Sequence, residues 1–293
     1  MDKSTLSNYG WIVIVTLVLA VMLALATPFG TFVGKGASNV IKTFVQSSDS
    51  AVDEDNIDTK SEDWDIYLNN DDYNHKGVVP EGGVYTDVNG NVYTKGDSFP
   101  ELQTGDEYQY GDYTYKCTAR TGFRAYVKDT TQETYGPMLD TINGIPVAYL
   151  MNLFSTCTNL KYLDENFRMP SQAINCNAMF RNCKSIEYIS GNFVIPKTVK
   201  SISSMFYQCT SLKTLPENFT IPKTVLAGAS MFAYCTNFTG TVTIEPNPNS
   251  PMTTTNPFAY TEKPIIVRAS ATQIQLIKEM SPTLPATVSF VEI

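Results

Sequence analysis

The chain has 293 residues, of which 43% are hydrophobic and 12% are aromatic, so most of it is expected to fold. The formal charge of −8 is local, because residues 48–81 contain eleven acidic residues against two lysines and the remainder sums to +1. A nucleic-acid partner, which needs massed Lys and Arg, is therefore not expected, and the single histidine, His75, excludes most His-based catalytic and zinc arrangements.

The N-terminal segment is long and apolar. Residues 10–33 carry no charge, and as a helix they would span roughly 36 Å, enough for a bilayer core of about 30 Å. Apolar residues continue at helical spacing as far as Phe44, so residues 1–47 are predicted to form a hydrophobic and amphipathic helix. Three roles stay open: a membrane anchor through residues 10–33, which we prefer; a signal peptide cleaved after Ala24-Leu25-Ala26; and the assembly helix of a pilin-like filament subunit.

An acidic linker and a small β-rich module follow. Residues 48–80 cannot bury enough apolar surface to offset chain entropy, so they are predicted to be a flexible spacer. Within residues 81–145, Asn89-Gly90 predicts a hairpin between residues 84–86 and 92–94, which is favoured over a calcium loop at Asp87. A second hairpin is expected between residues 107–110 and 113–117, and a further strand at residues 123–127.

The end of this module is predicted to be helical. Thr130 or Thr131 can cap a short helix that continues through Ile142, and Asn143-Gly144 would end it in a left-handed turn.

Residues 146–262 contain a repeat. Phenylalanines recur every 26 residues, and in the first four coils a cysteine stands three residues later: Phe154, Phe180, Phe206, Phe232 and Phe258, with Cys157, Cys183, Cys209 and Cys235. Nine positions in each coil are apolar, as in the third: Phe206, Cys209, Leu212, Leu215, Phe219, Ile221, Val225, Gly228 and Met231. A fixed period of this kind predicts stacked coils with one continuous core.

The repeat weakens toward its end. Gly228 leaves a gap in the core, where Ala227 or Ala229 is expected to supply a little of the missing bulk. Glu245, Asn247 and Pro251 fall at core positions of the fourth coil. Residues 263–293 are predicted to cap the stack with a strand at 265–268, a helix opened by the capping box Ser270…Gln273, and a strand at 287–292.

The run Ile-Pro-x-x-Val-x-x-Ile-x-x-Met-Phe-x-x-Cys-x-x-Leu, from Ile195 through Leu212, resembles the BspA-like leucine-rich repeat of bacterial surface proteins. Residues 108–147 are similar to the segment that precedes such repeats. The resemblance covers roughly residues 105–290 and implies an α+β fold: a leucine-rich-repeat parallel β-solenoid behind the β-rich module and the N-terminal transmembrane-length helix. It also implies a surface or adhesive role without naming a ligand.

The cysteine column is predicted to be a ladder of buried, unpaired thiols. Equivalent cysteines in neighbouring coils would lie about 5 Å apart, but their parallel side chains cannot reach the dihedral of a disulfide. Cys176 occupies a core position, and Cys117 receives no role.

Candidate binding residues lie on the outward face of the stacked coils. One stripe contains exposed aromatic and charged residues: Lys161, Tyr162, Glu187, Tyr188, Lys213 and Thr214. The other combines an asparagine column with its neighbour: Asn166, Asn192 and Asn218, then Arg168, Val194 and Thr220. The alternative interpretation is that the asparagines only cap backbone groups and that the tyrosines are ordinary surface.

The sequence predicts no catalytic constellation, metal site or cofactor. The expected function is a non-enzymatic, membrane-anchored bacterial cell-surface protein that binds a protein or glycan ligand. The alternative is a filament subunit that forms homopolymers through its N-terminal helix.

Overall fold

The computed structural model describes residues 77–79, 81–99, 102–118, 122–142 and 144–293, all of which belong to one compact unit of the chain. The predicted N-terminal helix, with its membrane span at residues 10–33, and nearly all of the acidic linker lie outside the described residues. Within the described part, no helix is both long and apolar enough to cross a membrane.

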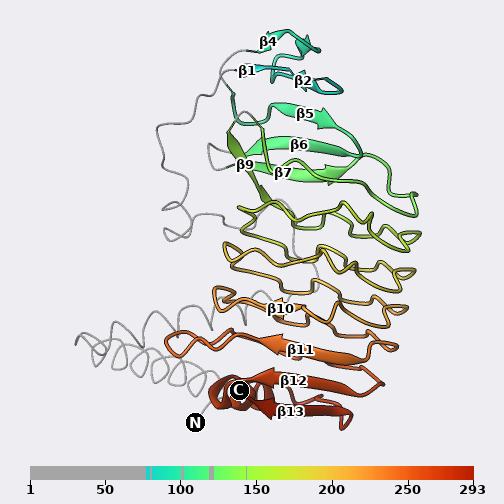
Figure 1. Cartoon of the computed structure of the whole chain (residues 1–293), viewed down its shortest axis with the longest axis vertical. Coiled ribbons are helices and arrows are strands. Elements are labelled where there is room, and N and C mark those ends of the chain that lie inside the picture. The colour runs from blue at the N-terminus through green and yellow to red at the C-terminus, as the bar shows by residue number, and fades with distance from the viewer. Residues whose placement is uncertain (1–76, 80, 100–101, 119–121, 143) are drawn as a thin grey trace, which may run out of the picture. The chain divides into compact units, whose positions relative to one another are not determined.

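The first described elements form a mostly antiparallel sheet at one end of the stack (Figure 1). Its strand order is β3-β2-β5-β6-β7-β9-β8, and β1 and β4 form a separate antiparallel pair. The bounds are β1 Gly77–Val78, β2 Val84–Thr86, β3 Val92–Tyr93, β4 Ser98–Phe99, β5 Glu107–Tyr110, β6 Tyr113–Thr118, β7 Gly122–Val127, β8 Thr141–Ile142 and β9 Ile145–Tyr149.

Both predicted hairpins are present. β2 pairs with β3 across Asn89-Gly90, and β5 pairs with β6 across Gly111-Asp112. The Asp87 carboxylate accepts from the backbone N–H groups of Asn89 and Asn91, each at 2.9 Å, so it stabilises the turn. Folded structure starts earlier than expected, because β1 and the buried Val79 fall at the end of the predicted linker.

The helix expected between residues 130 and 142 was wrong. This segment is extended and ends in β8, and Gly144, with φ of 82°, lies in the turn to β9. Long-range bonds replace helical ones: Tyr113 donates its hydroxyl to the Gly136 carbonyl at 2.7 Å, and the Leu139 N–H donates to the Tyr115 hydroxyl at 3.0 Å. Partners on β6 therefore satisfy backbone groups that a helix would have paired locally, and propensity gives way to them.

The antiparallel sheet passes into the solenoid at β7, which pairs in parallel with β9. A bulge interrupts this register after Phe123, and Gly122 has φ of 127° beside it. A Cβ at Gly122 would lie 2.8 Å from the Pro146 carbonyl oxygen, so the close approach of the two strands requires glycine.

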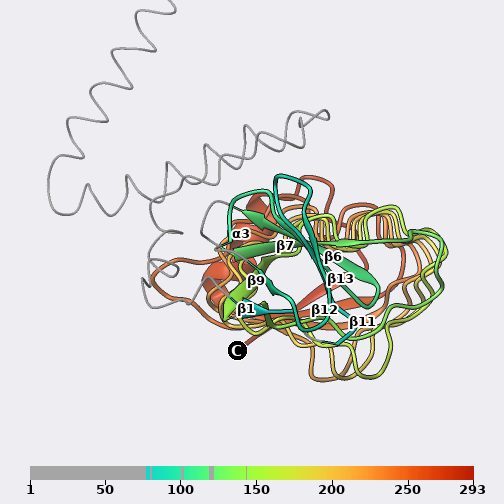
Figure 2. The ribbon, with the colours of Figure 1, turned by 90° about the horizontal axis from the view of Figure 1, so that it is seen from above.

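Residues beyond β9 form a parallel β-solenoid, whose coils superpose when viewed along the stack (Figure 2). Single bridges link equivalent residues 26 apart, from Tyr149 through Asn175, Ser201 and Ala227 to Thr253. Around each of the first four phenylalanines, four backbone N–H groups donate to the next coil. The first set is Leu150, Asn152, Phe154 and Thr156, bound to the carbonyls of Asn175, Asn177, Met179 and Arg181 at 2.8–2.9 Å. The sequence register is therefore the structural register.

Aromatic rings stack along the core. The centroids of Phe154, Phe180, Phe206 and Phe232 are 5.2 Å apart at each step, and Phe258 follows at 5.8 Å. A second column contains Phe167, Phe193 and Phe219, with centroids 6.5 Å apart. All the predicted inward positions of the first three coils are buried except Leu215, which is half-buried.

Each bend uses two left-handed residues. They stand two positions before and two after the stacked phenylalanine, in columns that keep the 26-residue period: Asn152, Ala178, Ser204, Ser230 and Asn256, then Thr156, Asn182, Gln208, Tyr234 and Tyr260. All have φ between 49° and 69°, a region that costs most side chains roughly 1–2 kcal/mol. The sequence repeat does not reveal this requirement, because none of these residues is glycine.

The fourth coil departs from the pattern and then recovers it. β10 (Thr220–Ile221) and β11 (Gly240–Ile244) pair in parallel, and the polar residues 245–251 form a loop before Thr253 rejoins the bridge column. Met252 fills the gap at Gly228, since a Cβ there would meet the Met252 sulfur at 2.7 Å. This filling comes from the next coil, and Ala229 beside Gly228 is also buried.

A strand–helix–strand unit ends the described stack (Figure 1). β12 (Ile265–Ala269) and β13 (Val288–Glu292) extend the parallel sheet, and α3 (Ala271–Glu279) connects them. Ser270 caps α3 by accepting from the Gln273 N–H. The Gln273 side chain donates instead to the Met252 carbonyl at 2.9 Å, so it ties the helix to the fourth coil rather than closing a capping box.

Candidate binding face

The first predicted stripe follows a backbone ladder. The Lys161 N–H donates to the Glu133 carbonyl at 2.9 Å, the Glu187 N–H to Lys161 at 3.2 Å, and the Lys213 N–H to Glu187 at 2.8 Å. Each coil thus places one charged residue beside the charged residue of the preceding segment. The outward side chains of this column are fixed in position by main-chain bonds rather than by loops.

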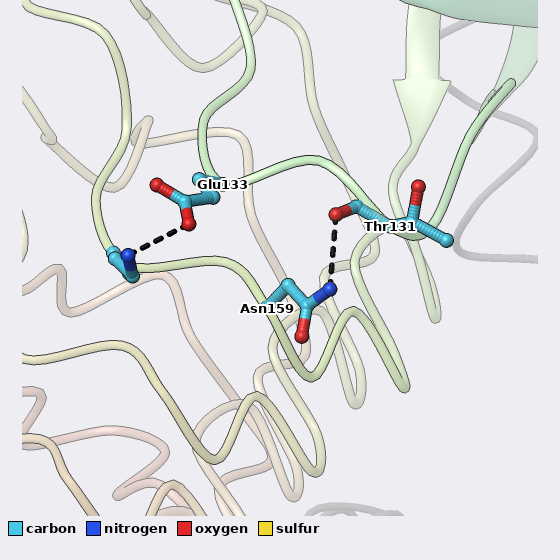
Figure 3. Close-up of polar contacts among 4 residues, drawn as sticks. Thr131, Glu133 and Asn159 are labelled. Carbon is cyan, nitrogen blue, oxygen red and sulfur yellow. Dashed lines mark hydrogen bonds and ion pairs between the residues drawn. The ribbon is translucent and has the colours of Figure 1, made fainter.

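Charges alternate along this column and pair within it. Lys161 Nζ lies 2.7 Å from Glu133 Oε1, and Lys213 Nζ lies 2.5 Å from Glu187 Oε2. A second contact also joins residues 159–161 to residues 131–133. In it, the Asn159 amide donates to the Thr131 carbonyl at 3.1 Å, near Glu133 (Figure 3). The hydrogen bond to Glu133 raises the pKa of Lys161, and all four charged side chains are more than 40% exposed. Exposed pairs of this kind contribute little to stability, so they order the surface more than they hold the fold.

Two tyrosines stand beside the charged column. Tyr162 is 42% exposed and Tyr188 is 53% exposed, and Tyr188 bridges in parallel to Thr214 of the next coil. The structure therefore brings the predicted stripe together as one surface, in which an aromatic row runs next to a row of alternating charge.

The asparagine column is engaged by the backbone. The Asn192 amide donates to the Glu165 carbonyl at 2.8 Å, and the Asn218 amide donates to the Gly191 carbonyl at 3.3 Å. Arg168 bends back to the carbonyls of Glu165 and Phe167, at 2.6 and 2.8 Å. The donors of Asn192 and Asn218 stabilise the preceding coil, which leaves their carbonyl oxygens as the groups that a ligand could reach.

The neighbouring column extends into the cap. Thr220 pairs with Thr243, Thr243 with Arg268, and Arg268 with Val291, so one row continues from the repeats across β11, β12 and β13. Val194 and Val291 on this row are 56% and 45% exposed. Sequence reasoning ended the row at Thr220 because the repeat spacing drops from 26 residues to 23 at that point.

The six cysteines are all free and buried. The Cys183, Cys209 and Cys235 thiols donate to the carbonyls of Phe154, Phe180 and Phe206 at 2.9–3.0 Å, so they link coils as well as filling space. Burial raises the pKa of every thiol, to about 11 for Cys117 and about 12 for Cys235. Neutral buried thiols are poor nucleophiles and poor metal ligands.

Sequence reasoning missed a third surface group at the bend. Tyr207, Tyr234 and Tyr260 contact one another in successive coils, with Arg181 over the first ring. Tyr207 follows its phenylalanine by one position, whereas Tyr234 and Tyr260 follow theirs by two. Because these offsets differ, the 26-residue period does not predict that the three tyrosines lie together.

No cluster of three or more potential metal-binding side chains occurs within the described residues, and His75 lies outside them. A scan of protein-family models, a search of curated proteins and a search of solved structures each found no significant match to the chain.

Proposed function

We propose that the chain is a cell-surface interaction protein that binds a protein or glycan ligand on the outward face of its solenoid, without catalysing a reaction. In this proposal residues 10–33 tether it to a membrane and the acidic segment 48–76 holds the head away from the surface. The resemblance of Ile195–Leu212 to BspA-like leucine-rich repeats supports a bacterial surface role.

The observation that carries the proposal is the stripe of Tyr162 and Tyr188 beside the column from Glu133 to Lys213. Exposed tyrosines are favoured in interfaces because they add contact area at a small entropic cost. Backbone ladders and two ion pairs hold this stripe in place, so little ordering is needed on binding.

The test is a binding screen of the full chain against an array of purified extracellular proteins and defined oligosaccharides. Replacing Tyr162 and Tyr188 together by alanine should weaken binding of the ligand by roughly 1 kcal/mol or more. Lys197→Ala is the matched control, because Lys197 is exposed but stands outside the stripe. Equal losses in both variants, or no ligand on the array, would contradict the proposal.

The tether is tested separately. Cells that produce the full chain should retain it in the membrane fraction, with residues 77–293 accessible to added protease. Polymers of the chain in electron micrographs would instead support the filament subunit and overturn the anchored monomer.

A further inference from the structure

Three tyrosines form a continuous strip across the bends of successive coils. The rings of Tyr234 and Tyr260 stack with centroids 4.5 Å apart and an interplanar angle of 17°. Tyr207 meets Tyr234 edge-on at 5.4 Å, and the Arg181 guanidinium lies 5.3 Å from the centre of the Tyr207 ring. We call these four side chains the tyrosine strip.

The backbone disfavours two of these tyrosines. Tyr234 has φ of 64° and Tyr260 has φ of 58°, in the column where earlier coils place Thr156, Asn182 and Gln208. A bulky side chain is rare in this region, and asparagine is accommodated there most readily after glycine. The fold requires a left-handed residue at this position but not a tyrosine, and an unfavourable side chain in a left-handed backbone is a reason to look for a function.

The strip is accessible. Tyr260 is 53% exposed, and Tyr207 and Tyr234 are half-buried. Tyr234 packs against one side of Tyr260, and no other ring contacts Tyr260 among the described residues. Burial, and after it the neighbouring Tyr260, raises the pKa of Tyr234 above its ordinary value.

The surrounding side chains indicate the chemistry of a ligand. Asn182 and Gln208 occupy the same column as Tyr234 in the two preceding coils, so this column presents uncharged hydrogen-bonding groups together with the rings. Arg181 disfavours a cationic ligand. Sugars combine apolar C–H faces, which pack on aromatic rings, with hydroxyls that bind amides and hydroxyls. A row one ring wide across several coils fits a linear chain of sugars better than a single ring.

We propose that the tyrosine strip binds a neutral polysaccharide chain that lies along the solenoid axis, with a sugar face on Tyr260. This inference rests on the proposed role of the solenoid as a binding surface, and it adds a ligand class and a second site. The Tyr162–Tyr188 stripe is a separate surface and is not needed for it.

The experiment is affinity electrophoresis of the full chain through gels that contain xylan, hydroxyethyl cellulose or soluble starch. At least one polysaccharide should retard the protein. Tyr234→Asn and Tyr260→Asn should each weaken that retardation by roughly tenfold. Each should leave the melting temperature unchanged or raised, because asparagine relieves the left-handed backbone.

The controls separate this inference from the proposed function. Thr156→Asn changes the same column in the first coil, away from the rings, and should keep full retardation, as should the Tyr162→Ala/Tyr188→Ala double variant. Retardation that is lost only in the double variant would overturn the strip while leaving a binding role for the stripe. A lower melting temperature in Tyr234→Asn would show that the ring is structural, and absence of retardation by all three polysaccharides would also overturn the inference.

Discussion

The two ends of the described chain use aromatic residues in opposite ways. The antiparallel module of residues 77–142 buries tyrosines, among them Tyr85, Tyr113 and Tyr135, whose hydroxyls reach specific distant partners. The solenoid buries phenylalanines that meet copies of themselves at a constant 5.2 Å through Phe232. The module depends on contacts that occur once, and the solenoid depends on one contact that is repeated.

This difference determines how much stability a single substitution costs in each region. In a stack, each coil contacts mainly its neighbours, so the cost of a core change depends on how many neighbours the residue has. In the module, the cost of removing a tyrosine hydroxyl depends on whether that hydroxyl makes a hydrogen bond. The substitutions below separate these two rules, beginning with the largest expected effect.

Phe206→Ala should destabilise the fold most, by about 3–5 kcal/mol, because its ring lies between two stacked rings and meets Phe193 and Phe219 edge-on. Phe258→Ala should cost distinctly less, since Phe258 stacks on Phe232 alone at the longer distance of 5.8 Å. Thermal and urea unfolding of the full chain measure both. Equal losses would mean that the capping unit encloses Phe258 as firmly as a further coil would.

Tyr113→Phe should lower the free energy of unfolding by about 1–2 kcal/mol, because it removes the hydroxyl that donates to the Gly136 carbonyl at 2.7 Å. Tyr108→Phe is the matched change, since the buried Tyr108 hydroxyl has no hydrogen-bond partner among the described residues, and it should be neutral or stabilising. Urea unfolding of the two variants tests the pair. A larger loss at Tyr108 would contradict the account of the module.

Alkaline pH should weaken the thiol ladder. Burial raises the folded-state pKa of Cys209 and its neighbours above the unfolded value, so their contribution is complete below that value and is lost as pH rises. Each thiol should contribute a loss of about 1 kcal/mol between roughly pH 8 and 9.5. Cys209→Ser retains a donor for the Phe180 carbonyl but removes one thiol. It should therefore reduce the loss of unfolding free energy across this pH range by the contribution of one thiol. An unchanged slope would contradict it.

Thr156→Asn should give the smallest effect, a stabilisation below about 1 kcal/mol, because Thr156 is exposed and β-branched at φ of 69°. The reverse change one coil later, Asn182→Thr at φ of 63°, should destabilise by a similar amount. Melting temperatures of the two variants that move in the same direction would show that the left-handed column does not govern either position.

Much of the solenoid followed from the sequence because its cause is periodic. The 26-residue spacing of phenylalanine and cysteine set the register, the core and the unpaired thiols, and the strand–helix–strand unit after residue 263 was also predicted correctly. The predicted helix failed, because tyrosines on β6 hold residues 130–142 extended through long-range hydrogen bonds. The sequence also did not indicate that Met252, from the next coil, fills the space at Gly228.

On the outward face, too, the features that keep the repeat period were predicted and those that depart from it were not. The stripe of Tyr162 and Tyr188 was visible because both residues keep one offset. The tyrosine strip was not, because its members change offset and because a left-handed backbone without glycine leaves no mark in the sequence. The linear extension of the outer row to Val291 likewise depended on a change of spacing that only the strand register reveals.

The central claim is that equivalent phenylalanines in adjacent coils touch, and a pair of double-mutant cycles tests it most directly. Leucine replaces phenylalanine at positions 180 and 206 in one cycle and at 154 and 206 in the other, with unfolding free energy as the readout. Phe180 and Phe206 stack at 5.2 Å, so their coupling should be about 0.5–1.5 kcal/mol. Phe154 lies two coils from Phe206 and shares only the intervening Phe180 with it, so the coupling in that cycle should be distinctly smaller. Coupling that is absent in the first cycle, or equal in both, would contradict the stacked register.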